Sequence, residues 1–261
     1  MKGHLEVAKA AAVKAGRLLR DRLYESRDVT YKGEINLVTE MDRVSERTVV
    51  ETILEAFPDH GVLAEEEARI KNSSGFLWII DPLDGTTNYA HGYPSFSVSI
   101  GLESTDGVIV GVVYDPMRDE LFSAARGQGA FLNGKSIEVS RNEVLIRSLL
   151  ATGFPYDRAV SKENNLNYFN ALIMASQEVR RSGSASLDLC AVAAGRLDGY
   201  WELKLQPWDV AAGSLIVQEA GGTVSDFTGI RFGIRDKELV ASNGRIHDLM
   251  LDILNAVKRK A

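Results

Sequence analysis

Residues 78–89 read WIIDPLDGTTNY, and this stretch is the most informative part of the chain. The apolar residues 76–80 predict a buried strand that ends at the carboxylate of Asp81. The proline and glycine that follow predict a turn that brings Asp84 back beside Asp81. The stretch therefore predicts two carboxylates held side by side at the end of a strand.

An anion site is predicted directly after these carboxylates. Gly85, Thr86 and Thr87 offer backbone N–H groups where a helix or helical turn could begin. Such groups, with the positive end of a helix dipole, suit a phosphate. Carboxylates beside an anion require cations between them, and oxygen ligands without a nearby Cys or His favour Mg²⁺. The stretch therefore indicates metal-assisted phosphate chemistry. The alternative is ordinary turn chemistry, with Thr86 capping a helix.

The composition is that of an ordinary globular protein. The chain has 261 residues, 45% of them hydrophobic and 25% charged, which suffices for one large domain or two coupled halves. The net charge of −6 and the lack of a basic stripe argue against direct nucleic-acid binding. Cys190 is the only cysteine, which excludes an internal disulfide. Because neither a signal peptide nor an apolar run of membrane-spanning length is evident, we expect a cytoplasmic protein without membrane attachment.

The hydrophobic periodicity changes along the chain. In the first half it predicts helices at 4–24 and 39–57 and strands at 76–80, 96–102, 108–114, 120–125 and 129–132. In the second half it predicts strands at 148–152, 179–182, 199–202, 223–225 and 239–241, alternating with helices at 163–176, 184–194, 210–220 and 245–257. The first half thus predicts helices on a mainly antiparallel sheet, and the second half βαβ units. We expect one unit, 1–261, in two coupled halves, 1–145 and 146–261.

Two further acidic elements could complete a metal site. Glu65 follows the apolar residues 62–64, so it would stand at the end of a strand, and it begins a run of three glutamates. Register with the apolar residues favours Glu65 over the other two, and the alternative is a solvated acidic turn. Asp209 would lie in the first turn of an apolar helix, where capping is the alternative role. The small residues 211–213 predict close packing of that helix.

Another acidic element precedes all of these. Residues 37–42 read LVTEMD, with Thr39 three positions before Asp42. This spacing is typical of a capping box at the start of a helix.

Together these motifs resemble the signatures of the inositol monophosphatase family, most closely those of its bacterial members. Residues 81–89 match D-P-[IL]-D-G-T-x-N-[FY], residues 37–42 match L-V-T-x-x-D, and residues 208–213 with 219–222 match W-D-x-A-A-G and E-A-G-G. Residues 65–66 are similar to the family's E-E pair, and residues 181–186 to its substrate-side turn. The resemblance covers nearly the whole chain. It implies an α+β or α/β fold, the layered α-β-α-β-α sandwich of the sugar phosphatases, and a homodimer.

The resemblance implies two or three Mg²⁺ ions held by oxygen donors: Glu65, Asp81, the carbonyl of Leu83, Asp84 and Asp209. The first ion would take the first three donors, and the second ion Asp81 with the last two. A weaker third ion could use Glu65 with water near Asp42. Mn²⁺ could substitute for Mg²⁺, and Li⁺ could inhibit by occupying a weak site after turnover.

The resemblance also assigns the remaining roles. The catalytic residues would be Asp42, Glu65 and Thr86, with Asp42 and Thr86 orienting the attacking water. The backbone N–H groups of Gly85, Thr86 and Thr87 would hold the phosphate. The alcohol portion of the substrate would face Ser184, Ala185 and Glu202.

The implied activity is Mg²⁺-dependent release of phosphate from myo-inositol 1-phosphate by attack of water. Nucleotide-directed relatives follow the D-G-T motif with Lys-Glu, whereas this chain has Thr87 and Asn88, which favours an inositol phosphate. A dual activity that includes fructose 1,6-bisphosphate is the first alternative. The second is an additional, non-catalytic role in a transcription antitermination complex, which one bacterial relative has.

Overall fold

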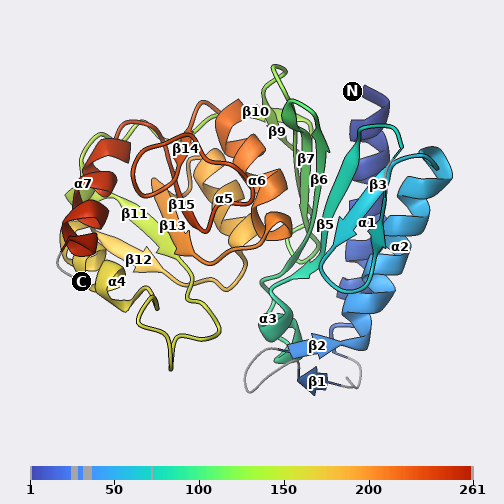
Figure 1. Ribbon diagram of the computed structural model, residues 1–261, viewed down its shortest axis with the longest axis horizontal. Helices are drawn as coiled ribbons and strands as arrows, with labels where there is room; N and C mark the ends of the chain where they lie inside the picture. The colour runs from blue at the N-terminus through green and yellow to red at the C-terminus, as the bar shows by residue number, and fades with distance from the viewer. Residues whose placement is uncertain (1, 25–28, 32–36, 72, 260–261) are drawn as a thin grey trace.

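Two β-sheets and three layers of helices stack along the long axis of the molecule (Figure 1). The structure is a computed structural model that describes residues 2–24, 29–31, 37–71 and 73–259. Among these residues, one sheet has eight strands, the other has five, and a two-stranded ribbon pairs β1 (Val29–Tyr31) with β2 (Leu37–Thr39). The layers follow the order α-β-α-β-α, so the predicted sandwich is confirmed.

The larger sheet has the strand order β10-β9-β8-β7-β6-β5-β3-β4. Its strands are β3 (Gly61–Ala64), β4 (Arg69–Ile70), β5 (Leu77–Asp84), β6 (Ser97–Ser104), β7 (Gly107–Asp115), β8 (Glu120–Ala125), β9 (Ala130–Leu132) and β10 (Lys135–Ile137). Only β3 and β5 pair in parallel, as expected for a mainly antiparallel sheet. Its outer face is covered by α1 (Lys2–Asp21) and α2 (Glu40–Ala56), which bury alanines and larger apolar residues at helical spacing.

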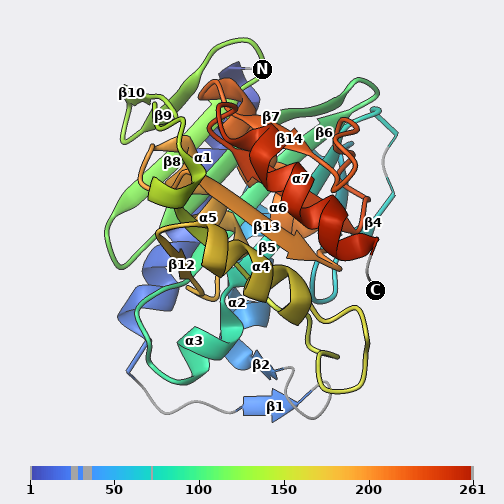
Figure 2. The ribbon, with the colours of Figure 1, turned by 90° about the vertical axis from the view of Figure 1, so that its left-hand side faces the viewer.

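The smaller sheet has the order β12-β11-β13-β15-β14. Its strands are β11 (Leu149–Thr152), β12 (Glu178–Arg180), β13 (Gly199–Leu203), β14 (Thr223–Ser225) and β15 (Glu238–Ser242). β11 pairs in parallel with β12 and β13, as the βαβ prediction requires, whereas β15 is antiparallel to both of its neighbours. Across its outer face lie α4 (Leu166–Ala175) and α7 (His247–Lys258) (Figure 2).

The middle layer consists of α5 (Ala185–Ala193) and α6 (Pro207–Glu219), and it is packed very closely. A Cβ on Gly101 of β6 would come within 2.8 Å of the Cβ of Ala211, and one on Gly111 of β7 within 2.7 Å of the carbonyl oxygen of Ala212. The small residues of α6 therefore meet glycines on the sheet, which confirms the predicted close approach of this helix. In the described ranges, no helix is long and apolar enough to cross a membrane.

The structure corrects the expected end of the strand before Asp81. β5 does not stop at residue 80 but continues to Asp84, and pairing with β6 resumes there after an irregularity. Pro82 lacks an N–H group, so it interrupts the ladder without ending it. Asp84 is therefore the last residue of the strand, not a residue that a turn brings back. The short polar strand β10 was not predicted, because its sequence lacks an apolar alternation.

Candidate active site

Carboxylates from three separate segments line one cavity of about 530 Å³. Glu65 follows β3, Asp81 and Asp84 belong to β5, and Asp209 lies in the first turn of α6. A smaller adjoining cavity of about 100 Å³ shares Asp84 and Asp209 with the first. All four residues that the sequence suggested as acidic metal ligands thus line the same cavity.

Parallel pairing of β3 with β5 sets Glu65 beside Asp81. Ala64 is paired with Ile80, and the N–H of Glu65 donates to the carbonyl of Ile80 at 3.1 Å, so the pairing continues by one residue. Of the three consecutive glutamates, only Glu65 lines the acidic cavity. Glu67 instead forms an exposed ion pair with Arg43 at 3.1 Å.

Burial and mutual repulsion raise the pKa values of these carboxyl groups. Asp81 is only 2% exposed, and burial followed by repulsion from Glu65, Asp84 and Asp209 raises its pKa well above the usual range. Burial likewise raises the pKa of Asp209 to about 8, with repulsion from Asp84 adding to the effect. Three neighbouring aspartates with raised pKa values, beside Glu65, form a site that a cation would stabilise.

Hydrogen bonds orient the carboxylates of Asp81 and Asp209. The N–H of Leu83 donates to Oδ1 of Asp81 at 3.0 Å, and the N–H of Gln206 donates to Oδ2 of Asp209 at 2.7 Å. Both bonds come from backbone groups close in sequence, so the strand residues just after Asp81 and the capping box of α6 fix the two side chains. Asp209 therefore has the capping role as well as a position in the cavity.

Asp84 connects the end of β5 to the start of α5. Its Oδ2 accepts hydrogen bonds from the hydroxyl of Ser184 at 2.6 Å, and from the N–H and hydroxyl of Ser186 at 2.8 and 2.6 Å. Burial still raises the pKa of Asp84, because these donors only partly offset the loss of solvent. Ser184, which the sequence suggested as a substrate contact, uses its hydroxyl here to orient Asp84.

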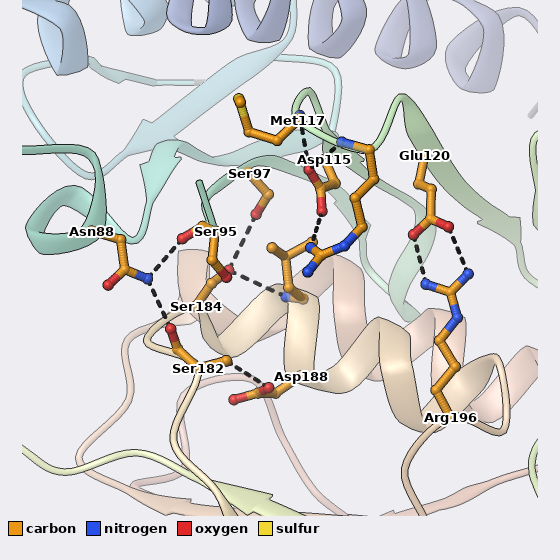
Figure 3. A network of polar contacts seen from close by, with 12 residues as sticks. Asn88, Ser95, Ser97, Asp115, Met117, Glu120, Ser182, Ser184, Asp188 and Arg196 are labelled. Atoms are coloured by element: carbon orange, nitrogen blue, oxygen red, sulfur yellow. Dashed lines mark hydrogen bonds and ion pairs between the residues drawn. The ribbon is translucent and has the colours of Figure 1, made fainter. Parts of the chain in front are cut away.

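A second set of polar contacts holds the start of α5 against the larger sheet (Figure 3). The side-chain amide of Asn88 donates to the carbonyls of Ser95 and Ser182 at 2.7 and 2.8 Å. The hydroxyl of Ser182 donates to Asp188 at 2.7 Å, and the hydroxyls of Ser97 and Ser184 lie 3.4 Å apart. These contacts link α3 (Thr86–Ala90) with α5 across the gap between the sheets.

Helix α2 presents Asp42 to the site. The carboxylate of Asp42 accepts the N–H and hydroxyl of Thr39 at 2.7 and 2.6 Å, which confirms the predicted capping box. Its other oxygen accepts the hydroxyl of Thr86 at 3.0 Å. The hydroxyl of Thr86 also lies 3.1 Å from the carbonyl of Leu83, so one proton is shared between two acceptors.

The same face of α2 holds two more residues that sequence reasoning missed. The hydroxyl of Ser45 donates to the carbonyl of Pro82 at 2.6 Å. Glu46, only 5% exposed, accepts the backbone N–H groups of Glu66, Glu67 and Ala68 at 2.8, 2.9 and 2.8 Å. Glu46 therefore anchors the loop that carries Glu65. The sequence feature that could have identified Glu46 is its place four residues after Asp42, on a helix face expected to be buried.

The expected phosphate-binding residues are arranged unequally. Gly85 and Thr86 line the acidic cavity, whereas Thr87 is exposed and is absent from its lining. Gly85 has φ of 99°, and a Cβ there would lie 3.0 Å from the carbonyl oxygen of Ser95. Glycine is therefore needed both for the backbone conformation and for the close approach of the neighbouring chain.

The expected alcohol-binding residues line the smaller cavity, together with a carboxyl group that sequence reasoning did not identify. Ala185 and Glu202 face this space, and Asp188 lies beside them. Burial raises the pKa of both Glu202 and Asp188 to about 7. Asp188 lies in the first turn of α5, a mostly apolar helix. A charged residue at this position of such a helix was the only feature of the sequence that could have identified it.

The chemistry of these donors fits hard divalent cations. The acidic groups and the carbonyl of Leu83 offer only oxygen, which suits Mg²⁺, an ion that keeps several of its waters. In the described part of the chain, no group of three or more His, Cys, Asp or Glu side chains is already arranged to hold a metal ion. The oxygen donors named above are therefore present in one cavity.

Comparison with known proteins agrees with the motifs. The model of the inositol monophosphatase family matches residues 2–259. An inositol-1-monophosphatase of Synechocystis sp. is 47% identical over 97% of this chain and 88% of its own length. The protein named Nus factor SuhB of Pseudomonas aeruginosa is 44% identical over 96% of this chain and 95% of its own.

Solved structures show the same fold. The inositol monophosphatase of Anabaena (Nostoc) sp. superposes with a TM-score of 0.89 at 46% identity, covering 98% of this chain and 96% of that one. The extragenic suppressor protein SuhB of Bartonella henselae gives a TM-score of 0.91 at 41% identity, covering 95% and 97%. The acidic cavity, the family model and these relatives together show that the chain is a phosphatase that belongs to the inositol monophosphatase family.

Proposed function

We propose that the protein is a Mg²⁺-dependent phosphate monoester hydrolase that releases phosphate from myo-inositol 1-phosphate. The observation that carries this proposal is the convergence of Glu65, Asp81, Asp84 and Asp209 on one cavity that adjoins a second, smaller cavity beside Glu202. The name inositol-1-monophosphatase of a relative that is 47% identical supports the substrate.

The proposed metal ligands follow from the donor set. Glu65, Asp81 and the carbonyl of Leu83 would hold one ion, and Asp81, Asp84 and Asp209 a second, with a weaker third near Glu65 and Asp42. The N–H donors of Leu83 and Gln206 each hold one oxygen of Asp81 and of Asp209, which fixes how these two carboxylates would meet the ions. Bound Mg²⁺ lowers the pKa of coordinated water and stabilises charge on the reacting oxygens.

The protein's own residues bind and orient the reactants. Asp42 fixes the hydroxyl of Thr86, whose oxygen retains a lone pair that accepts a hydrogen bond from the attacking water. Of the three expected donors, Gly85 and Thr86 line the cavity, and their N–H groups bind the phosphate, where backbone donors need no reorientation as charge develops. Ionised Glu202 accepts a hydroxyl of the inositol, and Ser184 and Ala185 complete the alcohol subsite.

The substrate is tested by comparing kcat/KM for myo-inositol 1-phosphate and fructose 1,6-bisphosphate at saturating Mg²⁺. A strong preference for the inositol ester supports the proposal. Comparable rates would keep the metal chemistry and assign the protein to a dual-specificity class. A preference for the sugar bisphosphate would refute the inositol assignment.

A second, non-catalytic role is proposed because a relative at 44% identity is named Nus factor SuhB. The chain would then also join a transcription antitermination complex. A pull-down with purified Nus factors tests this role, with Asp84→Asn as the variant that separates binding from turnover. Retention of the Nus factors by both proteins supports the second role, and their absence from both pull-downs refutes it.

We further propose that Mn²⁺ supports turnover in place of Mg²⁺, that Li⁺ inhibits it, and that the protein is a homodimer. These three proposals rest on membership of the family. Activity assays with each ion and light scattering of the purified protein test them. Turnover unaffected by Li⁺, or a monomer in solution, would refute the corresponding proposal.

A further inference from the structure

Glu202, the carboxylate of the proposed alcohol subsite, lies directly against Gly153. Gly153 follows β11, which pairs in parallel with β13 so that Thr152 is opposite Trp201. The next pair in this register is Gly153 and Glu202. A Cβ built on Gly153 would overlap the carboxylate of Glu202. The present position of the carboxylate is therefore compatible only with glycine at 153.

The backbone of Gly153 does not itself require glycine. Its φ lies outside the left-handed region, unlike that of Gly85 or Gly183. Other L-residues could adopt this conformation, so space for the carboxylate is the remaining reason for the glycine. The atoms that a Cβ would meet belong to the end of a flexible side chain, so the carboxylate can move without disrupting the backbone.

Gly153 cannot withdraw from Glu202, because buried hydrogen bonds fix the end of β11. The side-chain amide of Asn165, 1% exposed, donates to the carbonyl of Gly153 at 2.5 Å and to the hydroxyl of Thr152 at 2.8 Å. The indole of Trp201 donates to the same Asn165 at 2.8 Å, and the hydroxyl of Thr152 donates to the carbonyl of Trp201 at 2.6 Å. Asn165 thus links β11 to the strand that carries Glu202.

Tyr200 also holds the carboxylate of Glu202. Tyr200 and Glu202 are two positions apart on β13, so their side chains leave the same face of the sheet. The Tyr200 ring is fully buried in the core, and its hydroxyl donates to Oε2 of Glu202. Because the Tyr200 ring is fixed by burial and its hydroxyl is the donor, the carboxylate of Glu202 has one preferred position.

We propose that Gly153 is a specificity-determining residue, because its missing side chain leaves the space in which Tyr200 holds Glu202 toward the alcohol of the substrate. This inference rests on the proposed function and deepens it. A methyl group at 153 displaces the carboxylate, so recognition of a polyol is lost while the phosphate site is kept. Gly153 and Tyr200 are positioning residues, since they act through Glu202.

The test compares Gly153→Ala and Tyr200→Phe with the wild type on myo-inositol 1-phosphate and on 4-nitrophenyl phosphate, whose leaving group has no further hydroxyls. We expect the KM for the inositol ester to rise about tenfold, as for loss of a hydrogen bond to a charged group, with kcat little changed. The kcat/KM for 4-nitrophenyl phosphate should stay within about twofold. Gly3→Ala is the matched control, because a Cβ at Gly3 meets nothing within 4 Å.

A double-mutant cycle with Glu202→Ala shows whether Gly153 acts through the carboxylate. In the Glu202→Ala background, Gly153→Ala should cause no further rise in KM, because the methyl group then has space. An additional loss in that background, an unchanged KM in Gly153→Ala, or equal losses on both esters would overturn the inference. A wild type that hydrolyses 4-nitrophenyl phosphate but not the inositol ester would refute the proposed function, and with it this inference. A preference for inositol that survives in Gly153→Ala refutes the inference alone.

Discussion

The hydroxyl of Thr86 donates a hydrogen bond to Oδ1 of Asp42 at 3.0 Å, although 44 residues separate them in the chain. The bond joins the first turn of α2 to the start of α3, at the edge of the acidic cavity. Burial raises the pKa of Asp42, while hydrogen bonds from Thr39 and Thr86 lower it. The pair can thus orient a water molecule without either residue contacting the alcohol subsite.

Replacing Thr86 by valine should lower kcat about 100-fold or more, because valine keeps the shape and loses the hydroxyl. KM should change little, since the phosphate is held by backbone groups. Steady-state kinetics on myo-inositol 1-phosphate measure both. Thr86→Ser, which restores the hydroxyl, is the control and should recover most of the rate. A Thr86→Val variant with the wild-type kcat would show that the hydroxyl of Thr86 has no role in the reaction.

Replacing Glu46 by glutamine should lower the free energy of unfolding by about 2–4 kcal/mol, because an amide cannot accept all three backbone N–H groups at the loop that carries Glu65. Mg²⁺ should also bind more weakly, since Glu65 loses its fixed position. Denaturant unfolding and calorimetric titration measure the two effects. Glu51→Gln, on the exposed side of the same helix, should change neither. Equal behaviour of the two variants would contradict the anchoring role.

Replacing Asp209 by asparagine should stabilise the metal-free protein near neutral pH. The pKa of Asp209 is about 8 in the folded protein, above its usual 3.8, so between these values the folded state binds a proton that the unfolded state has lost. Its contribution to stability is complete below pH 3.8 and is lost as the pH rises toward 8. Chelator-treated wild type should therefore lose stability over this range, by at least about 1 kcal/mol, and the variant less.

Thermal unfolding with EDTA at pH 5 and pH 8 measures this difference, and added Mg²⁺ should restore the wild type more at pH 8. Asp226→Asn is a suitable control, because hydrogen bonds from Thr228 lower the pKa of Asp226 although burial opposes them. The opposite result would be a metal-free wild type that becomes more stable from pH 5 to pH 8 when compared with Asp209→Asn. That result would show that ionisation of Asp209 does not destabilise the metal-free protein.

The sequence predicted those parts of the site that local patterns encode. An apolar run before a carboxylate placed Glu65 after a strand and Asp81 in the last part of one, and the apolar helix that follows Asp209 placed this residue in its first turn. The capping box at Thr39 is likewise a short-range pattern. The layered order of the fold followed from the family resemblance, since periodicity alone could not determine how the two sheets stack.

The remaining features depend on contacts between distant segments. The bonds from Ser184 and Ser186 to Asp84, and from Glu66 to Glu46, join residues whose sequence neighbours carry no sign of the partner. The continuation of β5 past Pro82 depends on pairing with β6, which a local reading of Asp-Pro as a turn overlooks. Local patterns thus predicted which acidic residues lie near the ends of strands and helices. They did not predict the hydrogen bonds that hold the side chains of these residues.

The central claim is that the acidic cavity binds the metal ions on which turnover depends. Asp84→Asn tests it most directly, because asparagine keeps the shape and removes a ligand charge. We would measure phosphate release from myo-inositol 1-phosphate by wild type and variant at saturating Mg²⁺, with thermal unfolding of both as the control for folding. We expect turnover to fall at least about 1,000-fold in a folded variant. A folded Asp84→Asn protein that retains most of the wild-type rate would contradict this account.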